Sequence, residues 1–326
     1  MVDFHGFQGR TAAEMALYAS DAEQLFRNIL NTTPTGRPTI PATAPSPTAD
    51  PTMARVNSGD WLMVGELRAD DDLRNLQFLK QIFGLEQNNY FFGFLLKRIT
   101  PDPYFNPGDF LVIVRGTLQP IEWLLNICAA PDIVASKAHQ IDGQVPVGFY
   151  SIYQSMTLRD GGGAVLGSAD DEIAKIVNGP QTARLMVVGH SLGSALATYL
   201  MWELAQRINR PADQLFGYLF ASPRTGDDTF VKAFSRGGAN AMGMSYKGVP
   251  NYNVVNFARD IVPRVPPIGF ETLLGGSGDQ NIYIIDQTNT NPALFPTNDP
   301  GDNHNCINYA KMLSGDPNIT PAVSPR

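Results

Sequence analysis

The chain has 326 residues, of which 43% are hydrophobic and 17% are charged. This balance is that of a globular protein able to bury one core, and it excludes a largely disordered chain. The formal net charge is -7 and no basic cluster stands out, which argues against a nucleic-acid partner.

The first part of the chain is expected to contain two helices joined by an irregular segment. Apolar residues recur at helical spacing over residues 11–30, which predicts an amphipathic helix. Residues 31–52 are rich in proline, threonine and alanine, so we expect a surface segment without regular structure there. An acidic run then opens a second predicted helix over residues 70–87.

Strands begin near residue 90 and then alternate with helices. Two apolar runs, residues 90–99 and 110–115, flank a turn-rich segment and predict adjacent strands. Further strands are predicted over residues 184–189, 216–221, 252–258 and 281–285, and helices over residues 168–179, 192–207, 227–234 and 303–313. This alternation predicts an α/β fold with a mostly parallel central sheet, helices on both faces and an N-terminal helical segment.

The segment Gly189-His190-Ser191-Leu192-Gly193 is the only GxSxG pattern in the chain. It lies between a predicted apolar strand and a predicted helix, which is the setting of the nucleophile elbow of α/β hydrolases. The serine of such an elbow has a strained backbone that exposes Oγ, and side chains at both glycine positions would collide with the neighbouring strand and helix. We therefore predict that Ser191 is a nucleophile; the alternative is an ordinary turn with an N-capping serine.

A serine nucleophile needs a base that a third group orients. In the α/β-hydrolase fold the chain order is serine, acid, histidine, and His304 is the only histidine after Ser191. His304 is therefore the predicted base. Two aspartates follow predicted strands and are candidates for the acid, Asp260 and Asp286. Position favours Asp260, and Asp286 stays the alternative at this point.

Several segments over roughly residues 85–315 resemble those of class 3 lipases, the family of fungal triacylglycerol lipases and plant-type phospholipases A1. They are VRGT (114–117), VGFYSIY (147–153), VVGHSLGSALATY (187–199), FASPRTGDDTF (220–230), NFARDIVPRVPPIGF (256–270) and HNCINYAKML (304–313). The resemblance implies an α/β-hydrolase fold, places the family's acid at Asp260, and compares residues 147–153 with a strand and helix start. The chain departs from the family pattern at Glu122, where an aspartate is usual, and at Pro146, where a histidine is usual.

Stabilising the oxyanion of the reaction requires N–H donors. The backbone N–H of Leu192, which follows the nucleophile, is one expected donor, and the resemblance implies that Thr117 is the other. An apolar segment follows within residues 119–139 and contains Trp123, Leu124 and Leu125. The resemblance implies that these three residues belong to a lid or acyl-pocket wall that meets lipid; the alternative is a buried connecting helix.

Together these features predict a serine carboxylic-ester hydrolase, a lipase that acts on triacylglycerol or other acyl esters through an acyl-enzyme on Ser191. Phospholipase A1 and feruloyl or aryl esterase are alternatives within the same chemistry, and an inactive hydrolase-like binding protein is the alternative from another class. We expect a single domain over residues 1–326, in which residues 1–60 form the N-terminal helix and crossing segment and about residues 61–315 form the catalytic core.

The expected partner is an acyl-ester or lipid substrate, which a lipase meets at a lipid–water interface. No HExxH or clustered ligand spacing occurs, so we expect neither a metal nor another cofactor. No transmembrane segment is predicted. No signal peptide is visible, which indicates a cytoplasmic protein or a secreted protein whose leader has been removed. Cys128 and Cys306 are expected to be free buried thiols, and a disulfide between them is the alternative. The sequence leaves the oligomeric state open.

Overall fold

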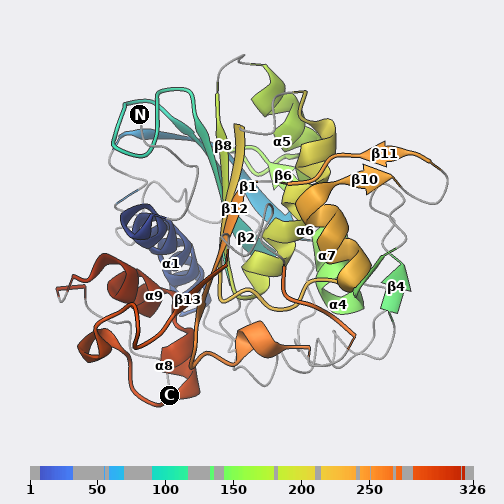
Figure 1. Ribbon diagram of the computed structural model, residues 1–326. Coiled ribbons are helices and arrows are strands. Elements are labelled where there is room, and N and C mark those ends of the chain that lie inside the picture. The colour runs from blue at the N-terminus through green and yellow to red at the C-terminus, as the bar shows by residue number, and fades with distance from the viewer. Residues whose placement is uncertain are drawn as a thin grey trace.

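A mixed β-sheet organises the computed structural model (Figure 1). The structure describes residues 8–31, 55, 59–69, 90–116, 133–135, 143–179, 183–209, 214–239, 243–249, 251–266, 269–273, 282–316 and 318–319. Across the sheet the strands are β13 (Ile282–Ile285), β12 (Tyr252–Phe257), β9 (Leu215–Phe220), β8 (Leu185–His190), β3 (Phe110–Val114), β2 (Tyr90–Arg98), β1 (Trp61–Ala69), β6 (Met156–Arg159) and β7 (Val165–Ser168).

The sheet has a parallel half and an antiparallel half. Strands β3, β8, β9, β12 and β13 pair in parallel, whereas β2, β1, β6 and β7 continue the sheet with antiparallel pairings. Every residue of β8, β9 and β12 is buried, as expected of parallel strands that are covered on both faces. The carboxyl ends of parallel strands lie at one edge, so the segments that follow β8 and β12 meet there.

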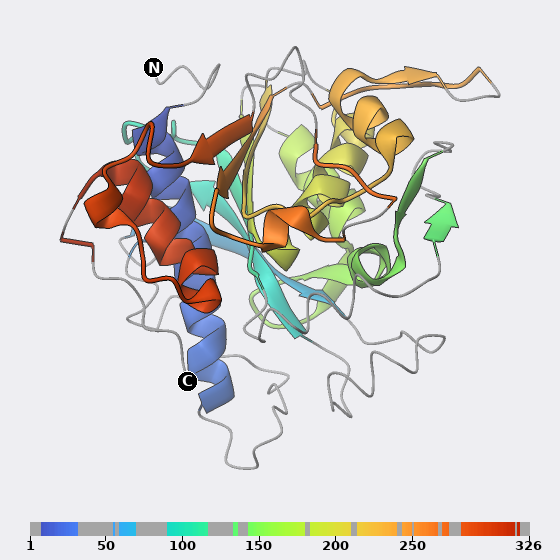
Figure 2. The same ribbon diagram turned by 60° about the horizontal axis from the view of Figure 1, so that its bottom comes forward.

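Helices cover both faces of this sheet (Figures 1 and 2). Helices α1 (Gly9–Asn31) and α9 (Cys306–Ser314) lie side by side on one face. The other face carries α4 (Val147–Gln154), α5 (Ala169–Asn178), α6 (Leu192–Arg207) and α7 (Asp228–Arg236). The predicted α/β architecture, with an N-terminal helix and helices on both faces, is confirmed, but the sheet is mixed and not mostly parallel, because β2, β1, β6 and β7 extend it with antiparallel pairings.

Shorter elements complete the described part of the chain. Two small antiparallel pairs are β4 (Ile133–Ala135) with β5 (Gln144–Pro146) and β10 (Gly238–Ala239) with β11 (Ser245–Tyr246). Two turns of 3-10 helix are η5 (Val262–Arg264) and η7 (Pro292–Leu294), and α8 (Pro300–His304) is a short helix that leads into α9. Residues 147–153, compared above with a strand and helix start, are helical throughout in α4.

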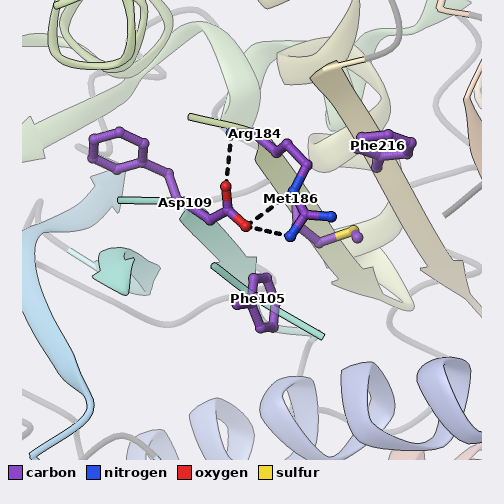
Figure 3. Close-up of a pocket in the computed structure, with 6 residues that line it drawn as sticks. Phe105, Asp109, Arg184, Met186 and Phe216 are labelled. Carbon is purple, nitrogen blue, oxygen red and sulfur yellow. Dashed lines mark hydrogen bonds and ion pairs between the residues drawn. The ribbon is translucent and has the colours of Figure 1, made fainter. Parts of the chain in front are cut away.

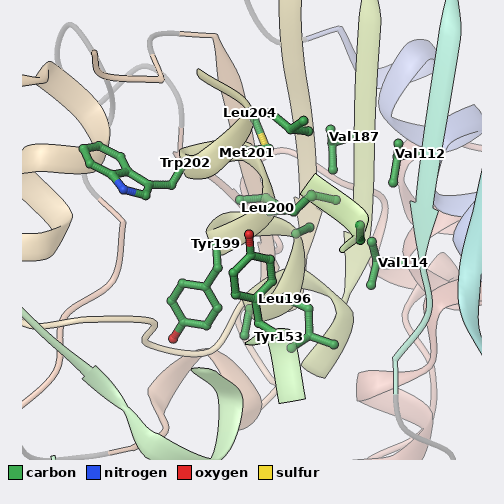
Figure 4. Close-up of a cluster of buried hydrophobic side chains, with 14 of the residues drawn as sticks. Val112, Val114, Tyr153, Val187, Leu196, Tyr199, Leu200, Met201, Trp202 and Leu204 are labelled. Carbon is green, nitrogen blue, oxygen red and sulfur yellow. The ribbon is translucent and has the colours of Figure 1, made fainter. Parts of the chain in front are cut away.

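The two faces of the sheet bury separate cores. Beneath α4 to α7, the rings of Tyr153, Tyr199 and Trp202 pack with the apolar residues of α6 and of strands β3 and β8 (Figure 4). On the opposite face, α1 presents small residues such as Ala16 and Ala19 to the sheet and to α9. Fully burying a large apolar side chain contributes about 1.5–3 kcal/mol, so both layers stabilise the sheet that positions the site.

An ion pair joins β3 and β8 at their amino ends. Arg184 donates to the Asp109 carboxylate from its backbone N at 3.0 Å and from Nε at 2.9 Å (Figure 3). The small hollow beside this pair is lined by Phe105, Met186 and Phe216. It lies at the opposite end of β8 from Ser191, so it takes no part in the site described below.

The last helix differs from its prediction, because residues 303–313 do not form one continuous helix. Helix α8 ends at His304 and α9 begins at Cys306. Asn305 between them has extended backbone angles, φ -71° and ψ 125°, and its side chain accepts a hydrogen bond from the N–H of Ile307 at 3.3 Å. An asparagine that caps the second helix in this way ends the first one.

Several expectations fall on residues outside the described ranges. They are the proline-rich segment over residues 32–52, the helix over residues 70–87, and the lid segment with Thr117, Trp123, Leu124, Leu125 and Cys128. Cys306 is a free buried thiol, as predicted, and its Sγ donates to the carbonyl of Ala16 at 3.3 Å. Within the described ranges, no helix is both long and apolar enough to cross a bilayer.

Candidate active site

Ser191 occupies a sharp turn between β8 and α6. Its backbone angles are φ 56° and ψ -127°, a conformation that residues with a side chain rarely adopt. The turn is held because the N–H of Ser191 donates to the carbonyl of Phe220 on β9 at 2.9 Å. A Cβ at Gly189 would lie 2.5 Å from the carbonyl oxygen of Gly193, and one at Gly193 would overlap the carbonyl of Val114 on β3. The collisions predicted for both glycine positions are therefore present.

The side chain of Ser191 faces His304 and makes no capping hydrogen bond to α6. Its Oγ lies 2.7 Å from Nε2 of His304, and Ser191 is fully buried. The alternative interpretation, an N-capping serine in an ordinary turn, does not fit this geometry. A serine hydroxyl in hydrogen-bond contact with an imidazole nitrogen is the arrangement that activates a nucleophile.

Asp260 lies on the other side of the His304 ring. Its Oδ2 is 2.8 Å from His304 Nδ1, and the carboxyl side chain is inaccessible to solvent whereas that of His304 is 12% exposed. The N–H of Val262 donates to Oδ1 at 2.9 Å, so the turn after β12 fixes the carboxylate. The structure thus brings the predicted nucleophile, base and acid into one hydrogen-bonded series at the carboxyl edge of the parallel strands.

Asp286, the alternative acid, is hydrogen-bonded within its own turn. It follows β13 and accepts hydrogen bonds from the N–H of Thr288 at 2.8 Å and from its hydroxyl at 2.5 Å. These bonds lower the pKa of the Asp286 carboxyl below its usual value. A carboxylate held by its own turn is not oriented toward His304, so Asp260 is the acid of the candidate site.

Tyr309 on α9 is a site residue that the sequence did not indicate. Its hydroxyl donates to Oδ2 of Asp260 at 2.8 Å and accepts from the N–H of Phe257 at 3.0 Å. Burial raises the pKa of the Tyr309 hydroxyl well above its usual range, so it remains protonated and able to donate. A tyrosine in an amphipathic helix is ordinarily a core residue, and no local pattern distinguishes this one.

Glu23 on α1 and His190 in the elbow are two further buried groups, and no local sequence pattern indicates a role for either. Oε1 of Glu23 lies 2.5 Å from Nδ1 of His190, and Nε2 of His190 lies 2.8 Å from the carbonyl oxygen of His304. Burial lowers the pKa of His190, but the Glu23 carboxylate, Asp260 and the contact with the His304 carbonyl together raise it by more, so the pKa is raised on balance. The N-terminal helix therefore contacts the site directly.

Of the two expected oxyanion donors, the structure describes the N–H of Leu192, at the start of the elbow helix. Leu192 is the first residue of α6, where helix N–H groups and the helix dipole favour negative charge. A Cβ at Gly116 would lie 2.9 Å from the carbonyl oxygen of His190, so the end of β3 passes directly beside the elbow. Thr117 follows Gly116 in the sequence but is outside the described ranges, as are Trp123, Leu124 and Leu125. Within those ranges no group of three or more potential ligands has the geometry of a metal site.

Comparison with known proteins identifies relatives of this chain. The model of the family described as Lipase (class 3) matches residues 111–270. Phospholipase A1-IIgamma of Arabidopsis thaliana is 30% identical over 181 residues, which cover 50% of this chain and 39% of that protein. Phospholipase A1-II 6 of Oryza sativa subsp. japonica is 34% identical over 176 residues, which cover 49% of this chain and 40% of that protein. The chain thus spans less than half the length of these curated relatives.

Solved structures share the fold at lower sequence identity. A propeptide complex of Rhizomucor miehei lipase superposes with a TM-score of 0.54 and 18% identity, covering 87% of this chain and 70% of that one. The lipase from Rhizopus microsporus var. chinensis gives a TM-score of 0.53 and 19% identity, covering 81% and 73% respectively. Given these matches, residues 111–270 of the chain belong to the class 3 lipase family, and the chain has the α/β-hydrolase fold.

Proposed function

We propose that this protein is a serine carboxylic-ester hydrolase that cleaves acyl esters of lipids. The observation that carries the proposal is the continuous series of contacts from Ser191 Oγ through His304 to Asp260, with distances of 2.7 and 2.8 Å. Family membership supports it, since the matched family is described as a lipase.

The geometry supports an acyl-enzyme mechanism. As Oγ of Ser191 attacks the ester carbonyl carbon, Nε2 of His304 takes the hydroxyl proton, and Asp260 holds the imidazole in the required tautomer. The resulting oxyanion would face the N–H of Leu192 and a donor from Thr117, each worth about 3–4 kcal/mol in the transition state. His304 then gives the proton to the leaving alkoxide. In the second half of the reaction His304 takes a proton from water, which attacks the acyl-enzyme, and gives it to Oγ of Ser191 as the acid leaves.

The substrate class we favour is a long-chain acyl ester, for which two candidates remain. The matched family is described as a lipase, and a solved structure of the same fold is the triacylglyceride lipase of Rhizomucor miehei; both favour triacylglycerol. The plant relatives named phospholipases A1 favour a phospholipid, whose cleavage gives one fatty acid and one lysophospholipid. Trp123, Leu124 and Leu125 are proposed to contact the acyl chain or the lipid surface in either case.

Loss of the nucleophile tests the reaction itself. Ser191→Ala should reduce hydrolysis of a soluble p-nitrophenyl ester on the order of 10^4-fold or more, with an unchanged melting temperature. A fluorophosphonate probe should label the wild-type protein and not the variant. Wild-type protein that neither turns over esters nor reacts with the probe would instead support the inactive binding protein.

Product analysis separates the two substrates. Purified protein is offered emulsified triacylglycerol and, separately, phosphatidylcholine vesicles, and the released lipids are identified by mass spectrometry. A lysophospholipid that lacks the chain from the first glycerol position indicates phospholipase A1, whereas diacylglycerol from the emulsion indicates a lipase. If both substrates are inert while short soluble esters are cleaved, the long-chain assignment is wrong and an aryl or short-chain esterase is favoured.

A further inference from the structure

The carboxylate of Glu23 is buried in the middle of α1, where the proposed mechanism does not use it. Only 9% of its side chain is exposed, and the neighbouring helix positions that face the sheet are small or apolar. Burying a carboxylate is costly unless hydrogen bonds and an opposite charge compensate. Here Oε1 lies 2.5 Å from Nδ1 of His190 and accepts the N–H of Gly116 at 3.1 Å, so both partners belong to the site.

Gly116 makes room for this carboxylate. A Cβ at that position would lie 2.6 Å from Oε1 of Glu23 and 3.0 Å from Nδ1 of His190. A residue with a side chain would therefore displace the carboxylate from the elbow. The contact between Glu23 and the elbow therefore requires a glycine at position 116, directly before the expected oxyanion donor Thr117 in the sequence.

The second ring nitrogen of His190 holds the main chain of His304. Nε2 lies 2.8 Å from the His304 carbonyl oxygen, at the point where α8 ends and Asn305 has extended backbone angles. A carbonyl and a carboxylate are both acceptors, and a neutral imidazole has a single N–H. Both contacts are therefore satisfied by the doubly protonated ring, whose charge is balanced by Glu23. The raised pKa of His190 agrees with this state.

We propose that Glu23 is a positioning residue of the active site, which through His190 holds the backbone of His304 and through Gly116 holds the backbone that follows β3. This inference rests on the proposed ester-hydrolase function. A second residue of α1 supports it, because Phe26 lies one turn beyond Glu23 and its ring centroid is 3.5 Å from the guanidinium carbon of Arg115. Helix α1 thus contacts both residues that end the β3 segment.

The groups around His190 come from several elements, and Glu23 and Asp260 are the charged side chains that raise its pKa. Glu23 lies on α1, and Asp260 follows β12. The His304 ring on α8 and the Tyr309 ring on α9 have centroids 4.8 Å and 6.0 Å from that of His190. Arg115, at the end of β3, interacts with the Glu23 carboxylate. Among these, Glu23 is the carboxylate in direct contact with the ring.

Two substitutions in the full chain separate positioning from stability. Glu23→Ala removes both contacts and should lower kcat on a soluble ester on the order of 100-fold with little change in KM, because a small misplacement of His304 affects mainly the transition state. Glu23→Gln should restore most of that loss, since the amide can accept from Gly116 and donate to a neutral His190. Rates are expressed per active site, counted by completed fluorophosphonate labelling.

Asp21→Asn provides a matched control on the same helix. It also removes a largely buried carboxylate of α1. Asp21, however, pairs with Arg55, whose Nε lies 3.4 Å from its Oδ2, and the proposal gives Asp21 no role in the elbow. This variant should retain the wild-type kcat. An equal loss in Asp21→Asn and Glu23→Ala would mean that any charge removed from α1 disturbs the site, and the positioning role of Glu23 would be overturned.

A spectroscopic measurement tests the same contact without turnover. The chain has four histidines, so nitrogen-15 labelling of histidine gives few ring signals, and a His190→Phe sample identifies those of His190. In the wild-type protein near neutral pH both ring nitrogens of His190 should carry protons, and in Glu23→Gln only one should.

The outcomes distinguish this inference from the proposed function. Wild-type kcat per active site in Glu23→Ala, or no recovery in Glu23→Gln, overturns the positioning role, as does a singly protonated His190 in the wild-type protein. Retained hydrolysis by Ser191→Ala overturns the proposed function instead, and the histidine spectrum does not depend on it. If Glu23→Ala does not fold, Glu23→Gln and the wild-type spectrum still decide.

Discussion

The two helical layers that cover the sheet bury different chemistry. Under α6 the buried side chains are mostly apolar and aromatic: the ring of Tyr153 packs against that of Tyr199, and the ring of Trp202 packs against that of Phe230. Under α1 and α9 the sheet meets hydrogen-bonded ionisable groups, among them Glu23 and Tyr309. Apolar burial is non-directional, whereas a hydrogen bond fixes an orientation. Both layers stabilise the sheet by apolar burial, and the α1 and α9 layer is in addition expected to set the geometry of the candidate site.

The largest effect should come from the histidine on the α1 and α9 side. His304→Ala should lower kcat on the order of 10^4-fold or more, as base and nucleophile act together. The melting temperature should change little, because the His304 side chain is at the edge of the core. The double variant with Ser191→Ala should lose hardly more than either single variant. Losses that multiply in steady-state assays would contradict the triad.

Asp260→Asn tests the acid on the same side. The amide should leave His304 in the wrong tautomer and reduce kcat by up to about 10^4-fold. The matched control is Asp286→Asn, which changes a carboxylate after the neighbouring strand β13 and should leave kcat unchanged. The ester assay measures kcat for both variants. A large loss of kcat in Asp286→Asn with nearly full kcat in Asp260→Asn would show that Asp286 is the acid.

Trp202→Ala, on the α6 side, should show the opposite behaviour. Trp202 is fully buried and its ring contacts those of Phe230 and Tyr246. Removing a buried tryptophan should lower the free energy of unfolding by about 3–5 kcal/mol. The kcat per labelled active site, measured below the melting temperature, should remain near that of the wild type. A specific loss of kcat here would erase the functional difference between the two layers.

Local pattern explains what the sequence could predict. The elbow and helix α6 were found because the strand, the turn and the helix are contiguous, and the order of residues in the fold then selected His304. Strand β1 was missed because Glu66 and Arg68 interrupt its apolar pattern. In the structure these two side chains point to one face of β1 and pair with each other at 2.8 Å while buried.

The supporting contacts of the site had no local signal. Glu23 and His190 are 167 positions apart in the sequence, and Tyr309 and Asp260 are 49 apart. A single glutamate in an amphipathic helix is ordinarily solvated, and only the packing of α1 against the elbow shows that this one is not. The break at Asn305 was also missed, because its extended backbone depends on the cap it gives to α9.

The smallest effect concerns a charge on α1 that lies away from the elbow. Burial raises the pKa of Asp21 from 3.8 to about 6, although Arg55 lowers it in part. A carboxyl with a raised pKa in the folded state destabilises that state where it is ionised, above about pH 6, and has no effect below about pH 4, where both states bind the proton. Asp21→Asn should therefore raise the free energy of unfolding by roughly 1–3 kcal/mol at pH 8, and the gain should vanish toward pH 4.

Asp286→Asn should behave in the opposite sense, because hydrogen bonds from Thr288 lower the pKa of Asp286 and its ionised form stabilises the fold. Urea titrations of both variants at pH 4, 6 and 8 check the two signs. A stability gain for Asp21→Asn that does not depend on pH would show that the charge of Asp21 is not its cause. The ionisable groups under α1 would then affect the geometry of the candidate site and not the free energy of unfolding.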